Sequence, residues 1–141
     1  MMTVPMHLRF LALLLIALAP FGKSLSFAHH SLTAEFDMKK RVTLTGMVTK
    51  IEWTNPHVWI YVDVKDPRSG KVSVWIFQLN SPNALERFGW TRNTLKAGDE
   101  VIVDGAPSRD GWTHQASARR IRRPDGQTIP TGYPPDSDGT R

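Results

Sequence analysis

The sequence predicts a mainly β fold, a small five-stranded Greek-key barrel with one short helix between the third and fourth strands. Apolar residues alternate with a period of two from residue 41 onward, which is typical of strands with one buried face. Clusters of Pro, Gly, Asn and Asp separate the alternating runs, and one segment carries helix-capping residues instead.

The first strand is expected over residues 41–53. Its apolar side chains change faces along the run, with one set formed by Val42, Leu44 and Val48 and the other by Met47, Ile51 and Trp53. A strand of this kind usually curls so that it serves two parts of a barrel. Gly46 permits the bend.

A hairpin is expected next. Residues 57–64 place aliphatic side chains on one face and His57, Trp59 and Tyr61 on the other. Residues 66–70 contain the Pro and Gly of a tight turn, and residues 71–79 alternate again. The aliphatic face of the hairpin is the expected core.

Residues 81–89 predict the helix, because Ser81 can cap it, Pro82 suits its first turn and Gly89 suits its end. Two further strands are expected over residues 101–103 and 113–121. Three strands, a helix and two strands is the order of an OB-fold, a partly open barrel that binds ligands across its second and third strands. A small split barrel or a sandwich would give a similar order.

Residues 1–28 predict a cleaved signal peptide. Arg9 precedes an apolar block over residues 10–19, helix breakers follow it, and Ser26-Phe27-Ala28 supplies small residues at both positions that a signal peptidase reads. The block is too short to span a bilayer comfortably, and no cysteine follows it to carry a lipid. We therefore expect export to the periplasm as a chain that begins at His29 and keeps no stable membrane anchor. An uncleaved anchor is the alternative.

Charge and composition limit the partners. The 141 residues carry a formal net charge of +5, and loss of Arg9 and Lys23 with the signal peptide reduces it to +3. So mild an excess on an exported chain predicts an unknown small ligand or an envelope protein as partner, and no nucleic acid. Because the chain has no cysteine, packing alone must hold the domain in an oxidising compartment.

After the signal peptide we expect three segments. They are an extended lead-in over residues 29–40, the barrel over residues 41–123, and a Pro- and Gly-rich disordered tail over residues 124–141 with one short β-like piece around residues 127–129. Four arginines end the last strand: Arg119, Arg120, Arg122 and Arg123. They predict a solvated, charged edge, with an anionic envelope component as the functional alternative.

Four motifs carry a resemblance: His29-His30-Ser31, the run EWTNPHVW over residues 52–59, Ser81-Pro82-Asn83 and Gly89-Trp90-Thr91. They are similar to motifs of a family of small exported bacterial proteins classed only as a domain of unknown function. The resemblance covers nearly the whole mature chain as far as residue 123. It implies an exported OB-like β domain and no particular activity.

The predicted mature N-terminus is a candidate metal site. A free N-terminal His29 offers its α-amine and a ring nitrogen, and a second imidazole could complete a three-nitrogen site for Cu(II), which resembles the histidine brace of copper enzymes and carriers. His57 and His114 are candidate third ligands, and His30 could bind instead. The site requires cleavage directly after Ala28; otherwise the two N-terminal histidines are a solvated start of the chain.

A second candidate site is an aromatic row. His57, Trp59 and Tyr61 share one face of the second strand, and Trp53 and Trp75 support them in this interpretation. Aromatic rings on an open OB-type sheet can stack on bases or sugar rings. The same rings could instead pack as core under the helix or the N-terminal segment.

Motifs of common enzyme classes are missing from the sequence, which has no Gly-x-Ser-x-Gly elbow, phosphate loop or His-Glu-x-x-His helix. We therefore expect a non-enzymatic, exported OB-like binding module of unknown ligand, with copper as its candidate cofactor. The alternatives are a copper-dependent oxidative enzyme with the same brace and a structural envelope domain that binds other proteins.

Overall fold

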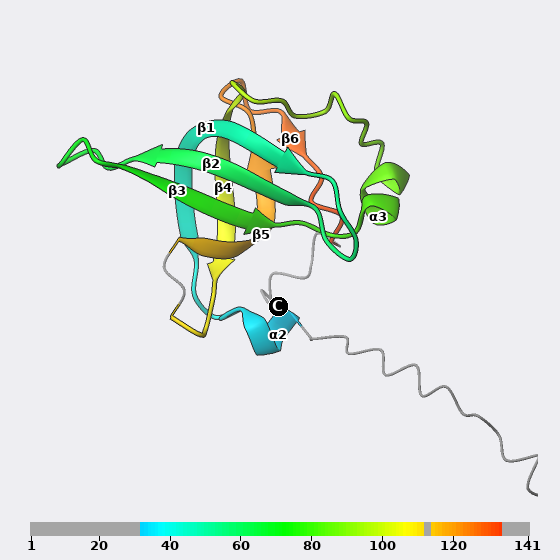
Figure 1. Cartoon of the computed structure of the whole chain (residues 1–141), viewed down its shortest axis with the longest axis horizontal. Helices are drawn as coiled ribbons and strands as arrows, with labels where there is room; N and C mark the ends of the chain where they lie inside the picture. The colour runs from blue at the N-terminus through cyan, green and yellow to red at the C-terminus, as the bar shows by residue number, and fades with distance from the viewer. Residues whose placement is uncertain (1–31, 112–113, 134–141) are drawn as a thin grey trace, which may run out of the picture.

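The computed structural model describes residues 32–111 and 114–133, which form a closed barrel (Figure 1). Its elements in chain order are α2 (Leu32–Glu35), β1 (Val42–Glu52), β2 (Trp59–Lys65), β3 (Val72–Gln78), α3 (Pro82–Arg87), β4 (Glu100–Pro107), β5 (Gln115–Arg122) and β6 (Thr128–Ile129). The sheet order is β3-β2-β1-β4-β5-β6, and a parallel pairing of β3 with β5 closes the ring. The predicted OB-like five-stranded barrel, with its helix between the third and fourth strands, is confirmed.

The curled strand β1 joins the two halves of the barrel. Residues 42–47 pair with β4 and residues 47–52 pair with β2. Gly46 lies where β1 changes partners, and a Cβ at this position would lie 2.3 Å from the backbone oxygen of Asp63 and 2.7 Å from Cγ1 of Val62. Only a residue without a side chain lets the two strands approach this closely.

A register shift in the β1–β2 pairing, between Val48 and Lys50, accounts for the change of apolar face along β1. An extra residue in one strand turns every later side chain to the opposite face. Val48 faces the core before the shift, and Ile51 and Trp53 pack against the core after it. Lys50 is consequently left exposed on the outer face.

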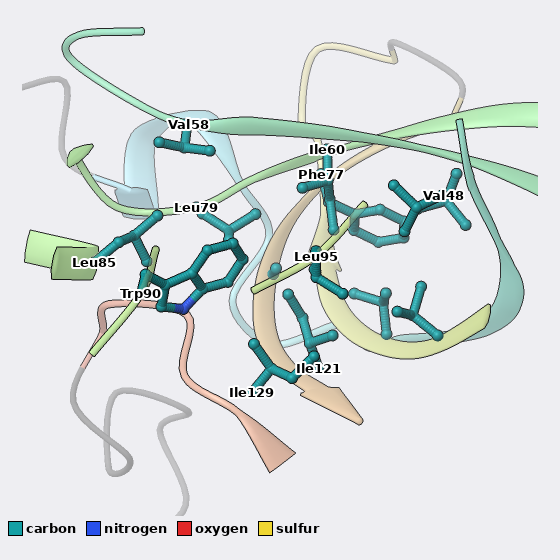
Figure 2. Close-up of a cluster of buried hydrophobic side chains, with 14 of the residues drawn as sticks. Val48, Val58, Ile60, Phe77, Leu79, Leu85, Trp90, Leu95, Ile121 and Ile129 are labelled. Atoms are coloured by element: carbon teal, nitrogen blue, oxygen red, sulfur yellow. The ribbon is translucent and has the colours of Figure 1, made fainter. Parts of the chain in front are cut away.

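The core fills the barrel and continues beneath α3 (Figure 2). Ser81 caps α3 by accepting a hydrogen bond from the backbone N of Ala84, and Pro82 occupies its first turn, as predicted. Trp90, which follows the helix, is 4% exposed and lies among Leu79, Leu85 and Ile129 in Figure 2. Its indole Nε1 donates a hydrogen bond to the backbone oxygen of Pro130 at 2.6 Å.

The lead-in differs from the extended chain that was predicted for residues 29–40. Its described part contains the single helical turn α2, and Phe36 directly after α2 is 1% exposed and forms an isolated β-bridge with Ser108. The lead-in turns because burying this phenylalanine anchors it to the barrel. No helix in residues 32–111 and 114–133 is long and apolar enough to cross a membrane.

The predicted disordered tail also needs correction as far as Tyr133. The short β-like piece expected around residues 127–129 is present as β6, and Ile129, Thr131 and Gly132 are buried. β6 pairs with β5, and Ile129 is 4% exposed. The side-chain Nδ2 of Asn80 donates to the backbone oxygen of Gly132 at 2.6 Å. These contacts extend the packed domain from the predicted boundary at residue 123 to Tyr133. The predicted signal peptide and residues 134–141 lie outside the described residues.

The contact at Gly46 predicts the effect of a Gly46→Ala substitution. The added Cβ must push β2 away from β1, which we expect to lower the free energy of unfolding by about 1–3 kcal/mol. Urea unfolding followed by tryptophan fluorescence measures this change. Thr45→Ala, an exposed position in the same strand, is the matched control and should cost less than about 1 kcal/mol. Equal stability of the two variants would contradict the role of Gly46.

Candidate functional site

The outer face of β1, β2 and β3 lies where OB-folds bind ligands. The pairing register places side chains of this face in three rows: Met47, Asp63 and Val74; Lys50, Tyr61, Ile76 and Gln115; and Glu52, Trp59, Gln78 and Ser117. Met47 and Val74 are 51% and 50% exposed, whereas Gln78 and Ser117 are 1% and 2% exposed. The face therefore has an open end on the projecting hairpin and a covered end where β3 meets β5.

An ion-pair network fixes the middle of the face. The Tyr61 hydroxyl donates to Oε2 of Glu52 at 2.9 Å, and Nζ of Lys50 pairs with Oε1 of the same carboxylate. The hydrogen bond from Lys50 lowers the pKa of Glu52, while burial raises the pKa of Tyr61. Nζ of Lys50 also lies 5.0 Å from the centre of the Tyr61 ring. The lysine therefore lies over the tyrosine ring, and Trp59 in the next row is the ring of this face without a lysine over it in the described residues.

A shallow hollow of about 200 Å³ lies beside that tryptophan. Glu52, Trp59, Tyr61, Ile76 and Gln115 line it. Its walls combine an aromatic ring, an aliphatic side chain, a carboxylate and an amide. The hollow can therefore receive a flat group next to Trp59 and hydrogen-bond its edge.

His57 lies at the covered end, just before β2. Its ring is half-buried and meets Trp59 edge-on, with the ring centres 6.5 Å apart. Burial lowers the pKa of His57 below its ordinary value of 6.5, against the opposing effects of Glu35 and of a hydrogen bond to the Leu79 backbone. Nδ1 is buried and has no hydrogen-bond partner among the residues that the structure describes. A neutral imidazole whose other nitrogen is held by a backbone carbonyl presents a lone pair, the form that binds metal ions.

Three chain segments meet at this covered end. The charge of Glu35, at the end of α2, raises the pKa of both His57 and Tyr133. Burial is the largest cause of the raised pKa of Tyr133, and the neighbouring Gln78 and Ser117 side chains oppose it. The last turn of α2, the start of β2 and the segment that follows β6 are therefore close enough for Glu35 to act on both side chains. Sequence reasoning missed Glu35 and Tyr133, because neither belongs to a periodic run and the tyrosine fell in the predicted tail.

The five predicted ring residues do not form one surface, which corrects the prediction of a joint aromatic site. Trp75 lies opposite core-facing Val62 and packs against the core, with its ring centre 6.0 Å from that of Phe77. Trp53 is turned inward by the register shift in β1, and its ring centre lies 6.1 Å from that of Trp90. His57, Trp59 and Tyr61 remain together.

The predicted metal ligands are also separated in the part that the structure describes. His114 has a φ of 70° and lies against Trp75, with 5.2 Å between the ring centres. His57 instead lies near Leu79, which directly follows β3 and comes four residues after Trp75. Within residues 32–111 and 114–133, no group of three His, Asp or Glu side chains could hold a metal ion. His29 and His30 lie outside the described residues.

The lowered pKa of His57 predicts a pH-dependent stability. In the unfolded chain His57 binds a proton near pH 6.5, whereas in the folded protein its pKa is lower. The free energy of unfolding therefore falls as the pH drops below 6.5. The loss is absent above that pH and should be missing in His57→Gln. Urea unfolding of both proteins at about pH 7.5 and about pH 5.5 measures the difference. Parallel losses in the two proteins would show that His57 titrates normally.

Solved structures with a similar arrangement include crystal structures of the mitochondrial single-stranded DNA binding protein Rim1 from S. cerevisiae. One matches with a TM-score of 0.47 and 9% identity, covering 60% of this chain and 93% of that chain. A second crystal form matches with a TM-score of 0.46 and 14% identity, covering 60% and 92%. At these identities the likeness concerns the fold alone.

These structures contradict the expectation that nucleic acid is no partner. That expectation rested on a mild net charge and on the predicted export. Proteins of similar strand arrangement are described as binding single-stranded DNA. A mild net charge is a weak ground for excluding a class of partner, and we drop the exclusion.

The sequence itself shows the family. No curated protein matches the chain. The family of unknown function DUF6152 matches residues 18–117, from the predicted signal peptide into β5. This range contains the motifs on which the resemblance rested. The chain belongs to DUF6152, a family of unknown function whose fold in this member is an OB-like barrel.

Proposed function

We propose that the protein is an exported, periplasmic OB-fold binding module, without enzymatic activity, that holds its ligand at the covered end of the outer face. The observation that carries the proposal is Nδ1 of His57, which is buried without a hydrogen-bond partner in the described part of the chain. Burying such an atom costs about 1–3 kcal/mol, and a ligand that bonds to it offsets that cost. The predicted signal peptide supports export.

Cu(II) is the ligand that suits this nitrogen. It prefers nitrogen donors in a plane, and the amine and imidazole of a mature N-terminal His29 would supply two further donors beside His57. His29 precedes Leu32, the first residue of α2, by three residues, a reach of up to about 10 Å. The other end of α2 is close enough for Glu35 to shift the pKa of His57.

A carrier fits these observations better than a copper-dependent oxidative enzyme. An oxidative enzyme must bring its substrate to an open position on the metal. Nδ1 of His57 is buried, Trp59 lies edge-on against the ring, and neighbouring Gln78 is 1% exposed. Such surroundings favour a site that holds its ion tightly. They do not favour a site where a substrate must reach the ion.

The test begins with the intact mass of the protein recovered from the periplasm, which we expect to start at His29. Cu(II) titrated into that species should bind with one-to-one stoichiometry and give the electron paramagnetic resonance spectrum of a nitrogen-ligated ion. Loss of one imidazole donor should weaken binding by more than about tenfold in His57→Gln and in His29→Ala. His114→Gln is the matched control and should bind as the parent does, because His114 packs against Trp75.

Two results would contradict the copper site. A first residue other than His29 removes the amine on which the ligand set depends. Copper affinity that is the same in His57→Gln as in the parent, or that is lost in His114→Gln, removes His57 from the site.

A further inference from the structure

A second pocket lies apart from His57, bounded by β4, β5, β6 and the segment that follows β6. Its volume is about 260 Å³. The residues around it are Arg41, Phe88, Asp104, Arg119, Arg120, Thr128, Ile129, Pro130, Thr131 and Tyr133. The arginines were expected to form a solvated edge, and residues 128–133 were expected to belong to a tail. The pocket exists because this segment folds back onto β5.

The pocket carries an excess of positive charge. Arg41, Arg119 and Arg120 contribute three cations and Asp104 one anion. The Asp104 carboxylate is already engaged, because it accepts a hydrogen bond from Oγ1 of Thr43 at 2.7 Å and lies 3.5 Å from Nη2 of Arg122. Its charge is thus balanced by an arginine outside the pocket lining, so Asp104 does not balance the positive charge that Arg120 brings to the pocket.

Apolar groups form the rest of the wall. Phe88, at the end of α3, is 48% exposed, although a phenylalanine is usually buried. Ile129 is 4% exposed, and Pro130 and the ring of Tyr133 lie beside it in the lining. The volume accommodates about nine groups of water size, at about 30 Å³ each. The space therefore fits a small organic molecule with a substantial apolar part.

We propose that this pocket binds a medium-chain fatty carboxylate, with its carboxylate on Arg120 and its hydrocarbon chain against Phe88 and Ile129. A planar guanidinium matches a carboxylate with two parallel hydrogen bonds. Arg120 is exposed and makes no ion pair or side-chain hydrogen bond with the described part of the chain. A neutral ligand would form no ion pair with Arg120. An inorganic anion would leave the apolar wall of the pocket exposed to water.

The experiment titrates sodium octanoate into the purified full chain and follows binding by calorimetry and by the amide NMR signals of Thr128, Ile129 and Thr131. We expect saturable one-to-one binding. Loss of the charge-assisted pair in Arg120→Gln should weaken it by about tenfold. Phe88→Ser should weaken it severalfold, because it removes apolar contact area. Both positions are exposed, so both variants are expected to fold.

Controls separate this pocket from other ways of holding octanoate. Arg68→Gln removes an exposed arginine of the β2–β3 turn and should bind as the parent does. 1-Octanol, which lacks the charge, should bind at least about tenfold more weakly. Equal affinity for octanol and octanoate, with no effect of Arg120→Gln, would mean adsorption on apolar surface and would overturn the proposal. Equally tight binding of inorganic phosphate at the same amides would overturn it in favour of a plain anion site.

Discussion

The close approach of Gly46 to the Asp63 backbone is the constraint on which the barrel depends. Because β1 can approach β2 closely at this point, its first half pairs with β4 and its second half pairs with β2. β3 is then carried around to β5, where the Ile76 amide donates to the His114 backbone oxygen at 2.8 Å. This closure brings Gln78 opposite Ser117, buries both and creates the covered end beside His57.

The segment that follows β6 shapes both candidate sites. Backbone and side-chain hydrogen bonds from Asn80 reach Thr131 and Gly132, and Trp90 reaches Pro130. The bound segment places Tyr133 so that its ring lines the arginine pocket while its hydroxyl group lies near Gln78 and Ser117. Tyr133 therefore borders both candidate sites.

Much of the fold could be predicted because its signals are local. The alternation of aliphatic residues, the capping by Ser81 and the missing side chain at Gly46 each act within a few residues. The inward position of Trp75 could also be predicted, because alternation along the strand puts it on the face opposite to Val74 and Ile76. The inward turn of Trp53 was not, because the register shift in β1 is set by pairing with β2.

The missed parts of the sites depend on contacts between distant segments. β6 has two residues and is stabilised by pairing with β5 and by Trp90, forty positions before its partner Pro130. The helical turn α2 has four residues and is stabilised by the burial of Phe36. Glu35, His57 and Tyr133 meet only after both segments have docked, so no spacing in the sequence could indicate their cluster.

The central claim is that closure of β3 onto β5 makes the covered end one cooperative unit with the barrel. Native-state hydrogen exchange measures this directly through the amides of Val48, Ile76 and Asn80, which donate to Asp99, His114 and Thr131. If the barrel opens as one unit, all three amides exchange with the same free energy of opening, equal to that of global unfolding. A much smaller value for Ile76 and Asn80 than for Val48 would contradict the claim, because the covered end would then open by itself.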